Sequence, residues 1–377
     1  MKYFIIAGEA SGDMHAAALM QAIKALDNDA VFAFLGGDLM AAQGGTMHKH
    51  YRAMAFMGFW EVAKNIDKVF DNYKACCKAI EQFVPDVVIL IDYPSFNLRI
   101  AKFVKHHFTC PVHYYISPKI WAWKEYRIKD IKKYIDRMFC IFPFELEFYA
   151  KHNFKVDYVG NPTSEKLLHY RNDKSKVVDF LSDNACDSRP IIAVLAGSRK
   201  QEIRKCLPKM LAAAAQFTTH QIVVAGAPGI DAAFYKPLMV GVDSKIIFAK
   251  THEIVQAADI AIVNSGTATL ETAIIGTPQV VVYHVMFGRL AYWLKSIVIK
   301  TKHISLVNII AQKAVVKELI AHLFTVENIV DEINEIRNNK NYNAEMKAGY
   351  DAIVEALGTK QAATETANLI YKALKNK

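Results

Sequence analysis

Short, nearly unbroken runs of Ile, Val, Phe and Tyr recur along the chain, and segments with helical spacing separate them. A strand with one solvated face alternates apolar and polar residues, whereas a strand buried on both faces is apolar throughout. Strands of the second kind that alternate with helices form parallel sheets covered by helices. This alternation constrains the fold more than any other feature of the sequence, and it predicts an α/β protein.

The apolar runs fall into two series. The first series predicts strands at residues 2–7, 31–35, 86–92, 111–117 and 137–142, and the second predicts them at 191–195, 221–224, 245–248, 259–263 and 279–283. Apolar residues at helical spacing predict helices at 14–26 and 201–217. The polar stretch 161–189 lies between the two series and is interpreted as a boundary and linker.

The chain has 377 residues, which is long for a single hydrophobic core and suits two doubly wound domains of about 170 residues each. A hydrophobic fraction of 53% supplies both cores and excludes a disordered chain. We expect two Rossmann-like domains facing across a cleft, at residues 1–165 and 166–345, followed by a C-terminal helical segment at 346–377. No run reaches the roughly 18 apolar residues that span a bilayer, so any membrane contact is expected to be peripheral.

The formal net charge of +9 fits an anionic partner, which includes nucleotides, phosphosugars, phospholipids and nucleic acids. The sequence contains no aromatic–basic RNA motif and no DNA-reading motif, so we expect no nucleic-acid partner. The six cysteines form no CxxC pair, and no His/Cys cluster has zinc spacing. Reduced thiols and no zinc site are therefore expected, and we expect no cofactor.

In open α/β sheets, ligands bind beyond the carboxyl ends of strands. The loop at residues 8–13 (GEASGD) follows the first predicted strand, and it lacks the GxGxxG spacing of a dinucleotide site, which disfavours an NAD oxidoreductase. Its carboxylates, Glu9 among them, suit sugar hydroxyls better than a pyrophosphate. Alternatively, Ser11 or Asp13 caps the helix that follows.

Asp92 ends a strongly apolar predicted strand within the segment 91–97 (IDYPSFN), which also contains Asn97. A partly desolvated carboxylate has a raised proton affinity and can serve as a general base. The alternative is a strand-terminal Asp that only caps the next turn.

Two loops of the second series favour anions. Gly197, Ser198 and Arg199 open a predicted helix, where a cation opposes the helix dipole unless an anion binds. Ser265, Gly266 and Thr267 open another helix, and Glu271, about one turn later, is placed to accept hydrogen bonds from a ribose. A well-capped helix is the alternative for this second loop. We therefore expect the second domain to hold a nucleotide diphosphate and the first to hold an acceptor and supply a base.

Nine short motifs in collinear order resemble those of the lipid A disaccharide synthase family, which has the two-Rossmann GT-B architecture. They are GEASGD (8–13), MGFWEV (57–62), IDYPSFN (91–97), YISPKIWAWK (115–124), FPFE (142–145), GSR (197–199), NSGTATLE (264–271), SLVN (305–308) and VVKEL (315–319). The sequence departs from the family's pattern at Ser95, where Asp is frequent, at Asn161, where His is frequent, and at Val307, where Pro is frequent.

The resemblance implies an inverting transfer of 2,3-diacylglucosamine from UDP-2,3-diacylglucosamine to 2,3-diacylglucosamine 1-phosphate, which forms the β-1,6 disaccharide of lipopolysaccharide in Gram-negative bacteria and releases UDP. It implies no metal. Asp92 matches the family's essential aspartate and Arg199 its essential arginine, whereas Glu9, Ser11, Glu271 and Asn308 match further site positions. A UDP-sugar epimerase or hydrolase of the same fold is the alternative function.

Acylated substrates require contact with a bilayer, so the resemblance implies a cytoplasmic enzyme bound peripherally to the anionic inner face of the inner membrane, and it allows a homodimer. Segments 54–70 and 284–303 combine aromatic and basic residues and are the candidate docking surfaces, with ordinary core-facing helices as the alternative. A basic run is a candidate for acceptor phosphate or lipid headgroups, with a solvated helix face as the alternative; it comprises Lys124, Arg127, Lys129, Lys132, Lys133 and Arg137.

Overall fold

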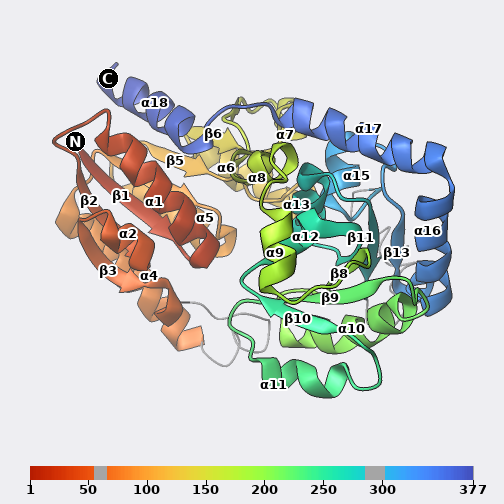
Figure 1. Ribbon diagram of the computed structural model, residues 1–377. Coiled ribbons are helices and arrows are strands. Elements are labelled where there is room, and N and C mark those ends of the chain that lie inside the picture. Colours follow the sequence, from red (N-terminus) through yellow and green to blue (C-terminus); the bar gives the residue numbers. More distant parts are fainter. Residues whose placement is uncertain (55–65, 285–301, 377) are drawn as a thin grey trace. The chain divides into compact units, whose positions relative to one another are not determined.

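The computed structural model describes residues 1–54, 66–284 and 302–376. The chain forms two compact units: the first comprises Met1–Glu165 and Thr359–Lys377, and the second comprises Lys166–Gly358. The C-terminal helices are divided between them, because α17 (Lys340–Leu357) belongs to the second unit, whereas α18 (Ala362–Lys375) packs beside α1 (Ala10–Lys24) of the first (Figure 1).

The first unit is built on a seven-stranded parallel sheet with the order β3-β2-β1-β4-β5-β6-β7. Its strands are β1 (Lys2–Ala7), β2 (Val31–Gly36), β3 (Thr46–His50), β4 (Val87–Ile91), β5 (Val112–Tyr115), β6 (Arg137–Cys140) and β7 (Asp157–Tyr158). Between them run α1, α2 (Asp38–Ala42), α4 (Ile66–Phe83), α5 (Pro94–His107), α6 (Ile128–Tyr134) and α7 (Phe144–Lys151), with short 3-10 turns at Tyr51–Ala53 and Glu125–Arg127.

The two faces of this sheet explain why its strands are apolar throughout. Phe4 and Ile6 of β1 enter one core, which the helices after β3 and β4 cover, whereas Tyr3 and Ile5 enter the opposite core, which contains residues of α1 and α18. Successive side chains of a strand point to opposite faces, so a strand with a core on each face has no position left for a polar residue.

The second unit contains a six-stranded parallel sheet with the order β10-β9-β8-β11-β12-β13. Its strands are β8 (Ile191–Leu195), β9 (Gln221–Gly226), β10 (Lys245–Phe248), β11 (Ala258–Asn264), β12 (Gln279–Tyr283) and β13 (Glu318–Ile320). The helices with their bounds are α8 (Pro162–Asn172, which begins in the first unit), α9 (Val177–Asp183), α10 (Lys200–Ala214), α11 (Ala232–Tyr235), α12 (Thr251–Ala257), α13 (Thr267–Ile275), α15 (Leu306–Ala311), α16 (Val326–Asn338) and α17, with 3-10 turns at Lys236–Leu238 and Ala321–Leu323.

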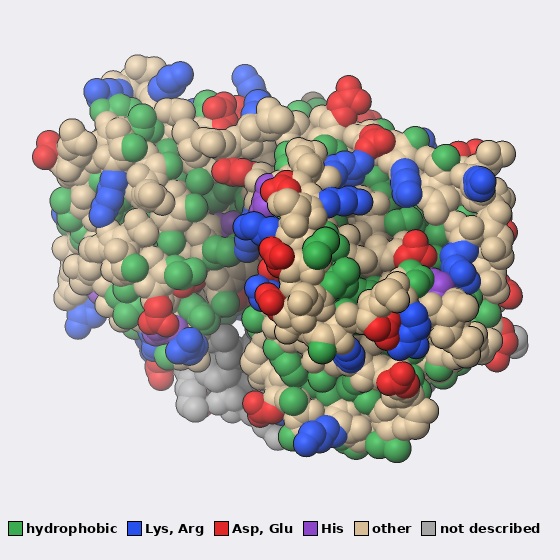
Figure 2. All heavy atoms as spheres, in the orientation of Figure 1, with side chains coloured by type: hydrophobic (Ala, Val, Ile, Leu, Met, Phe, Trp, Pro, Cys, Tyr) green, Lys and Arg blue, Asp and Glu red, His purple; other side chains and the backbone are tan. Residues whose placement is uncertain are grey.

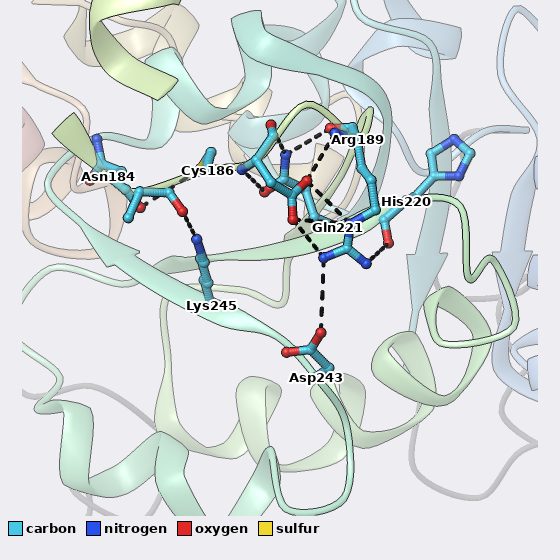
Figure 3. A network of polar contacts seen from close by, with 9 residues as sticks. Asn184, Cys186, Arg189, His220, Gln221, Asp243 and Lys245 are labelled. Carbon is cyan, nitrogen blue, oxygen red and sulfur yellow. Dashed lines mark hydrogen bonds and ion pairs between the residues drawn. The ribbon is translucent and has the colours of Figure 1, made fainter. Parts of the chain in front are cut away.

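Hydrogen bonds fasten the amino ends of three strands in this unit (Figure 3). The Gln221 amide at the start of β9 donates to the carbonyls of Asp187 and Arg189, at 2.9 and 2.7 Å, just before β8 begins. Lys245, at the start of β10, donates to the carbonyl of Ala185. These hydrogen bonds connect the strands at the amino edge of the sheet. Ligands of open α/β sheets bind at the opposite, carboxyl edge.

All ten predicted strands are present, with ends that differ by at most two residues, and both predicted helices are confirmed as α1 and α10. Three strands escaped prediction because β3 is polar (TMHKH) and β7 and β13 have only two and three residues. The linker interpretation of 161–189 was wrong for most of its length, because α8 and α9 occupy it. Their sequences look polar because only one apolar residue in each helix is buried, Leu167 in α8 and Phe180 in α9, while Tyr170 and Leu181 are half-buried.

Candidate active site

In each sheet the winding direction reverses between two neighbouring strands. The loops predicted from the sequence lie at these two points. In the first unit the reversal falls between β1 and β4, which carry Glu9 and Asp92 just beyond their carboxyl ends. In the second unit it falls between β8 and β11, which lead into the loops of Arg199 and Ser265. Doubly wound sheets bind their ligands at such switch points, so each unit has one candidate site.

The backbone around Asp92 is held in an unusual conformation. Asp92 and Tyr93 both have left-handed backbone angles, with φ of +43° and +49°. Residues other than glycine adopt this region at a cost of about 1–3 kcal/mol, and such strain clusters at functional sites. The turn lies directly after the carboxyl end of β4.

Three groups fix this turn from the protein side. The Asn97 amide donates to the carbonyls of Ile91 (3.2 Å) and Asp92 (2.6 Å), the Tyr114 hydroxyl donates to the same Asp92 carbonyl, and the Asp92 N–H donates to Tyr115 at 3.2 Å. Asn97 is fully buried, so in this structure its amide holds the turn of Asp92 from within. Direct contact of Asn97 with a substrate stays a prediction.

Asp92 is partly buried, and this environment raises its pKa to about 6. Burial is the largest cause, and the negative charge of Glu9 adds to it, whereas the positive charge of Lys119 and the backbone N–H of Tyr93 lower the pKa. A carboxyl group tuned in this way is mostly ionised at pH 7 and binds a proton more readily than an ordinary Asp. Asp92 thus has the proton affinity that a general base requires, and its role as a base stays a prediction.

The loop after β1 packs directly against the turn of Asp92. A Cβ on Gly8 would lie 2.3 Å from the ring of Tyr93, so only glycine permits this contact. Helix α1 begins at Ala10, which leaves Ser11 exposed in its first turn, where its hydroxyl donates to Glu9 at 3.3 Å.

Neither Ser11 nor Asp13 caps this helix. Asp13 instead accepts hydrogen bonds from the N–H groups of Gly37, Leu39 and Met40 at the start of α2. The alternative that Ser11 or Asp13 caps the helix after the GEASGD loop was therefore wrong.

A buried carboxyl group holds the loop that carries Lys119. Glu145, on α7, is 1% exposed; it accepts hydrogen bonds from the Ser117 hydroxyl, the Trp121 indole at 3.1 Å and the Phe142 N–H at 3.0 Å. Burial raises the pKa of Glu145 to about 7, although the three donors oppose that rise. The motifs at 115–124 and 142–145 therefore meet in one network that sets the position of Lys119 beside Asp92.

In the second unit, Gly197, Ser198 and Arg199 form the turn between β8 and α10. Gly197 has φ of +115°, and the side chain of Arg199 is 70% exposed. Glu202, in the first turn of α10, accepts a hydrogen bond from the Ser198 N–H at 3.1 Å, and its carboxylate lies 3.5 Å from the Arg199 guanidinium. In this structure the Glu202 carboxylate occupies these two donors, and the binding of a ligand anion by this turn stays a prediction.

The second loop of this unit connects β11 to α13. Ser265 is tied to β12 through its N–H (2.8 Å to the Val282 carbonyl), whereas Gly266 and Thr267 are exposed at the start of α13. Glu271, one turn later, lies 3.4 Å from the imidazole of His252 on α12. The exposed amino end of α13 thus stands next to a carboxylate that is oriented by a histidine.

Asn308 is buried and fully engaged within the protein. Its amide donates to the Val316 carbonyl (2.8 Å) and to Glu318 (3.1 Å) and accepts from the N–H groups of Val315 and Val316. Glu318 also accepts from Ser305, so the motifs at 305–308 and 315–319 form one network. In this structure Asn308 positions α15, and a contact of its side chain with substrate stays a prediction.

Comparisons with known proteins decide the family. A family model for lipid-A-disaccharide synthetase matches residues 3–372. The lipid-A-disaccharide synthase of Myxococcus xanthus (strain DK1622) is 37% identical, over 99% of this chain and 97% of that protein. The chain belongs to the lipid-A-disaccharide synthase family. It is a glycosyltransferase of lipid A disaccharide synthesis. The family's enzyme from Acidobacterium capsulatum is 36% identical, with 94% of this chain and 92% of that protein covered.

Solved structures share the fold of this lipid-A-disaccharide synthase family member at low identity. The UDP-GlcNAc 2-epimerase from Neisseria meningitidis bound to UDP-GlcNAc aligns with a TM-score of 0.66 and 12% identity, over 100% of both chains. A sucrose-phosphate synthase from Thermosynechococcus elongatus aligns with a TM-score of 0.59 and 13% identity, over 100% of this chain and 99% of that one. These likenesses confirm the prediction of two doubly wound domains. The epimerase alternative has only this shared fold in its favour.

Several expectations lie outside the described residues. The motif at 57–62 and most of the candidate docking segments 54–70 and 284–303 belong to this group. Across the described part of the chain, no helix is both long and apolar enough to cross a bilayer. On the face that Figure 2 shows, basic and acidic side chains are interspersed over the second unit, so no single-sign field marks a partner there.

Tertiary structure adds site residues that the sequence did not single out. Tyr114 of β5 and Lys119 of the loop after it reach Asp92 through the order of the strands, and Glu145 of α7 bonds to Ser117 and Trp121 on either side of Lys119. His252 and Glu202 reach the loops of the second unit from α12 and α10. The motif at 115–124 was the only signal for Lys119, and nothing in the sequence pointed to Tyr114 or His252.

Proposed function

We propose that this enzyme transfers 2,3-diacylglucosamine from UDP-2,3-diacylglucosamine to 2,3-diacylglucosamine 1-phosphate, with inversion at the anomeric carbon. The products are the β-1,6-linked disaccharide 1-phosphate and UDP. The observation that carries this proposal is the environment of Asp92, a carboxyl group of raised pKa in a fixed, strained turn at a switch point. Such a group suits removal of a proton from an acceptor hydroxyl.

The chemistry assigned to the first unit is general-base catalysis. Asp92 accepts the proton of the acceptor's 6-hydroxyl as that oxygen attacks the anomeric carbon of the donor, and the bond from this carbon to UDP breaks. Glu9 keeps the proton affinity of Asp92 high, whereas Lys119 keeps Asp92 ionised near neutral pH. Ser11, next to Glu9, and Asn97, behind Asp92, complete the acceptor side, Ser11 through its exposed hydroxyl and Asn97 by holding the turn.

The second unit supplies the groups for UDP. Arg199, with the N–H groups of the 197–199 turn and of Ser265–Thr267 at the start of α13, stabilises the negative charge that develops on the departing diphosphate. Glu271, oriented by His252, accepts hydrogen bonds from the ribose. Asn308 holds α15 against its neighbours in the same unit.

Acylated substrates reside in a bilayer, so the proposal places the enzyme at the cytoplasmic, inner face of the inner membrane as a peripheral protein. A net charge of +9 supports attraction to an anionic lipid surface. We propose the segments 54–70 and 284–303 as the enzyme's docking surfaces and a homodimer as its assembly.

The decisive experiment incubates the purified protein with UDP-2,3-diacylglucosamine and 2,3-diacylglucosamine 1-phosphate. We expect the wild type to form disaccharide and release one UDP per product. Asp92→Asn should lower the rate roughly 10²- to 10⁴-fold, the usual contribution of a general base, while UDP binding is retained. Asp86→Asn, at the opposite end of the same strand, is the matched control and should stay active. Release of UDP without acceptor would instead indicate an epimerase or hydrolase, and equal rates for both variants would remove Asp92 from the reaction.

A further inference from the structure

Arg127 belongs to the basic run between Lys124 and Arg137, and it contacts the segment that follows Asp92. This residue ends the short turn Glu125–Arg127, and its guanidinium donates to the Ser95 hydroxyl at 2.8 Å. Ser95 lies three residues after Asp92, in the first turn of α5. The positive charge of Arg127 also acts on Tyr114, whose hydroxyl is bonded to the Asp92 carbonyl.

We propose that Arg127 binds the phosphate of the acceptor sugar and so sets the enzyme's preference for a phosphorylated acceptor. This inference rests on the proposed function, because it assigns a ligand to the acceptor side of that site. The phosphate and the reacting hydroxyl belong to one sugar ring. The residues that serve them must therefore lie near each other, and the hydrogen bond of Arg127 to Ser95, three residues after Asp92, supports this arrangement.

Four other cations of this run have partners of their own, and Lys133 lies 5.4 Å from the ring centre of Tyr134. Arg137 forms an ion pair with Asp157 at 2.8 Å and donates to the Leu369 carbonyl. Lys132 donates to the carbonyl of His152 at 3.0 Å, and Lys124 lies 4.2 Å from the ring centre of Trp123. Among the described residues, no carboxylate lies within ion-pair distance of Arg127, which leaves its remaining N–H groups for an anion.

The chemistry of the guanidinium favours a phosphate group. Arg presents a planar set of N–H donors that matches two phosphate oxygens, and the bond to Ser95 orients this plane beforehand. Lys119, exposed on the same edge, adds a second positive charge near Asp92. Lys119, which acts electrostatically on Asp92, and Arg127, which is bonded to Ser95 in the segment that follows Asp92, thus offer two cations for a phosphate dianion.

The test compares two acceptors, 2,3-diacylglucosamine 1-phosphate and the same sugar without phosphate, in neutral detergent. We expect wild type to prefer the phosphorylated acceptor in kcat/KM by roughly 10- to 100-fold, the range of one charged hydrogen-bonded contact. Arg127→Met should erase that preference by raising KM for the phosphorylated acceptor, with the neutral acceptor and UDP affinity changed less than about twofold. Arg127→Lys should retain part of it, because it keeps the charge and loses the planar donors.

Lys129→Met is the matched control, because it removes the same charge at an exposed position two residues further along the chain. It should leave the preference intact. The inference is overturned if Arg127→Met slows both acceptors equally, which would mark a structural role, or if Lys129→Met has the same effect, which would mark nonspecific attraction. A wild type that forms no disaccharide at all would instead overturn the proposed function.

A phospholipid headgroup offers the same phosphate chemistry, and a binding assay distinguishes this source. Vesicles of phosphatidylglycerol and phosphatidylcholine should bind wild type and Arg127→Met equally if the acceptor is the ligand. Loss of vesicle binding in Arg127→Met, with the acceptor preference unchanged, would reassign the guanidinium to lipid and refute the inference.

Discussion

Glu9 and Asp92 extend from neighbouring parallel strands, and the charge of Glu9 adds to burial in raising the pKa of Asp92 to about 6. Register pairs Ala7 with Ile91, so Gly8 and Asp92 are the first residues past the sheet on each strand. Burial is the larger cause, and repulsion between the two carboxylates at this switch point adds to it in making Asp92 a better proton acceptor.

This relationship predicts the acid limb of the pH profile. Because the base must be ionised to accept a proton, kcat/KM should be constant well above pH 6 and fall about tenfold per unit below it. Glu9→Gln removes a negative neighbour that raises the pKa of Asp92, so the midpoint of this limb should move to lower pH. Initial rates from pH 4.5 to 8.5 test this, with Glu147→Gln, exposed on α7, as the control. A midpoint that stays in place or rises in Glu9→Gln would contradict the assignment.

Arg199 should contribute strongly to the binding of UDP. Its exposed guanidinium is close only to Glu202 among the described residues, and a diphosphate would form stronger, charge-assisted hydrogen bonds with it. We expect Arg199→Ala to weaken UDP binding roughly 10- to 100-fold, the cost of one such bond. Titration calorimetry measures this. Arg204→Ala, on the same helix with its guanidinium over the Phe234 ring, should change the affinity less than about twofold; an equal loss there would indicate a general charge effect.

Much of the fold and of the site followed from the sequence because both depend on local patterns. Strands apolar throughout predicted the two parallel sheets, and the rule that ligands bind beyond carboxyl ends pointed to Asp92, Gly197 and Ser265. The partners of these residues were not predictable, because Tyr114 and Lys119 reach Asp92 only through the order of strands β1, β4 and β5.

Local pattern also misassigned some polar residues for the same reason. A capping residue for α1 was one interpretation of Asp13, but its carboxylate accepts hydrogen bonds at the start of α2, a contact between elements that no spacing rule encodes. Asn97 and Asn308 were interpreted as binding residues; in this structure both amides are buried and bond to nearby backbone, and a direct contact with substrate stays a prediction for each. Sequence motifs identified where the polar residues gather, and the three-dimensional contacts assign their tasks.

Gly197 should be intolerant of a side chain. Its φ of +115° is unfavourable for other residues, and a Cβ there would lie 2.6 Å from a Glu202 carboxylate oxygen and 2.9 Å from the Asn264 amide. Gly241→Ala is the control for backbone strain alone, because Gly241 has φ of +82° and a Cβ added there would meet no atom within 4 Å. Gly241→Ala should lower the free energy of unfolding by about 1 kcal/mol. Gly197→Ala should lower it further and should also weaken UDP binding. Equal costs and unchanged affinity would show that the turn accommodates the methyl group.

The most buried carboxyl group of the site region should dominate local stability. Glu145 accepts three hydrogen bonds from Ser117, Trp121 and Phe142, and Glu145→Ala leaves these donors without an acceptor in the core. Each buried unsatisfied donor costs about 1–3 kcal/mol, so we expect a loss of roughly 3–5 kcal/mol in the free energy of unfolding after partial relaxation. Urea denaturation followed by circular dichroism measures this loss.

Glu147→Ala, on the same helix, removes an exposed carboxylate whose ion pair with Lys151 spans 2.9 Å, and it should cost less than about 1 kcal/mol. Because Glu145 also holds the loop of Lys119, its removal should free that lysine from Asp92. Lys119 lowers the pKa of Asp92, so the acid limb of kcat/KM in Glu145→Ala should move to higher pH, opposite in direction to the effect of Glu9→Gln. A large loss of stability with an unchanged acid limb would show that Glu145 stabilises the fold but does not influence the pKa of Asp92 through the loop of Lys119.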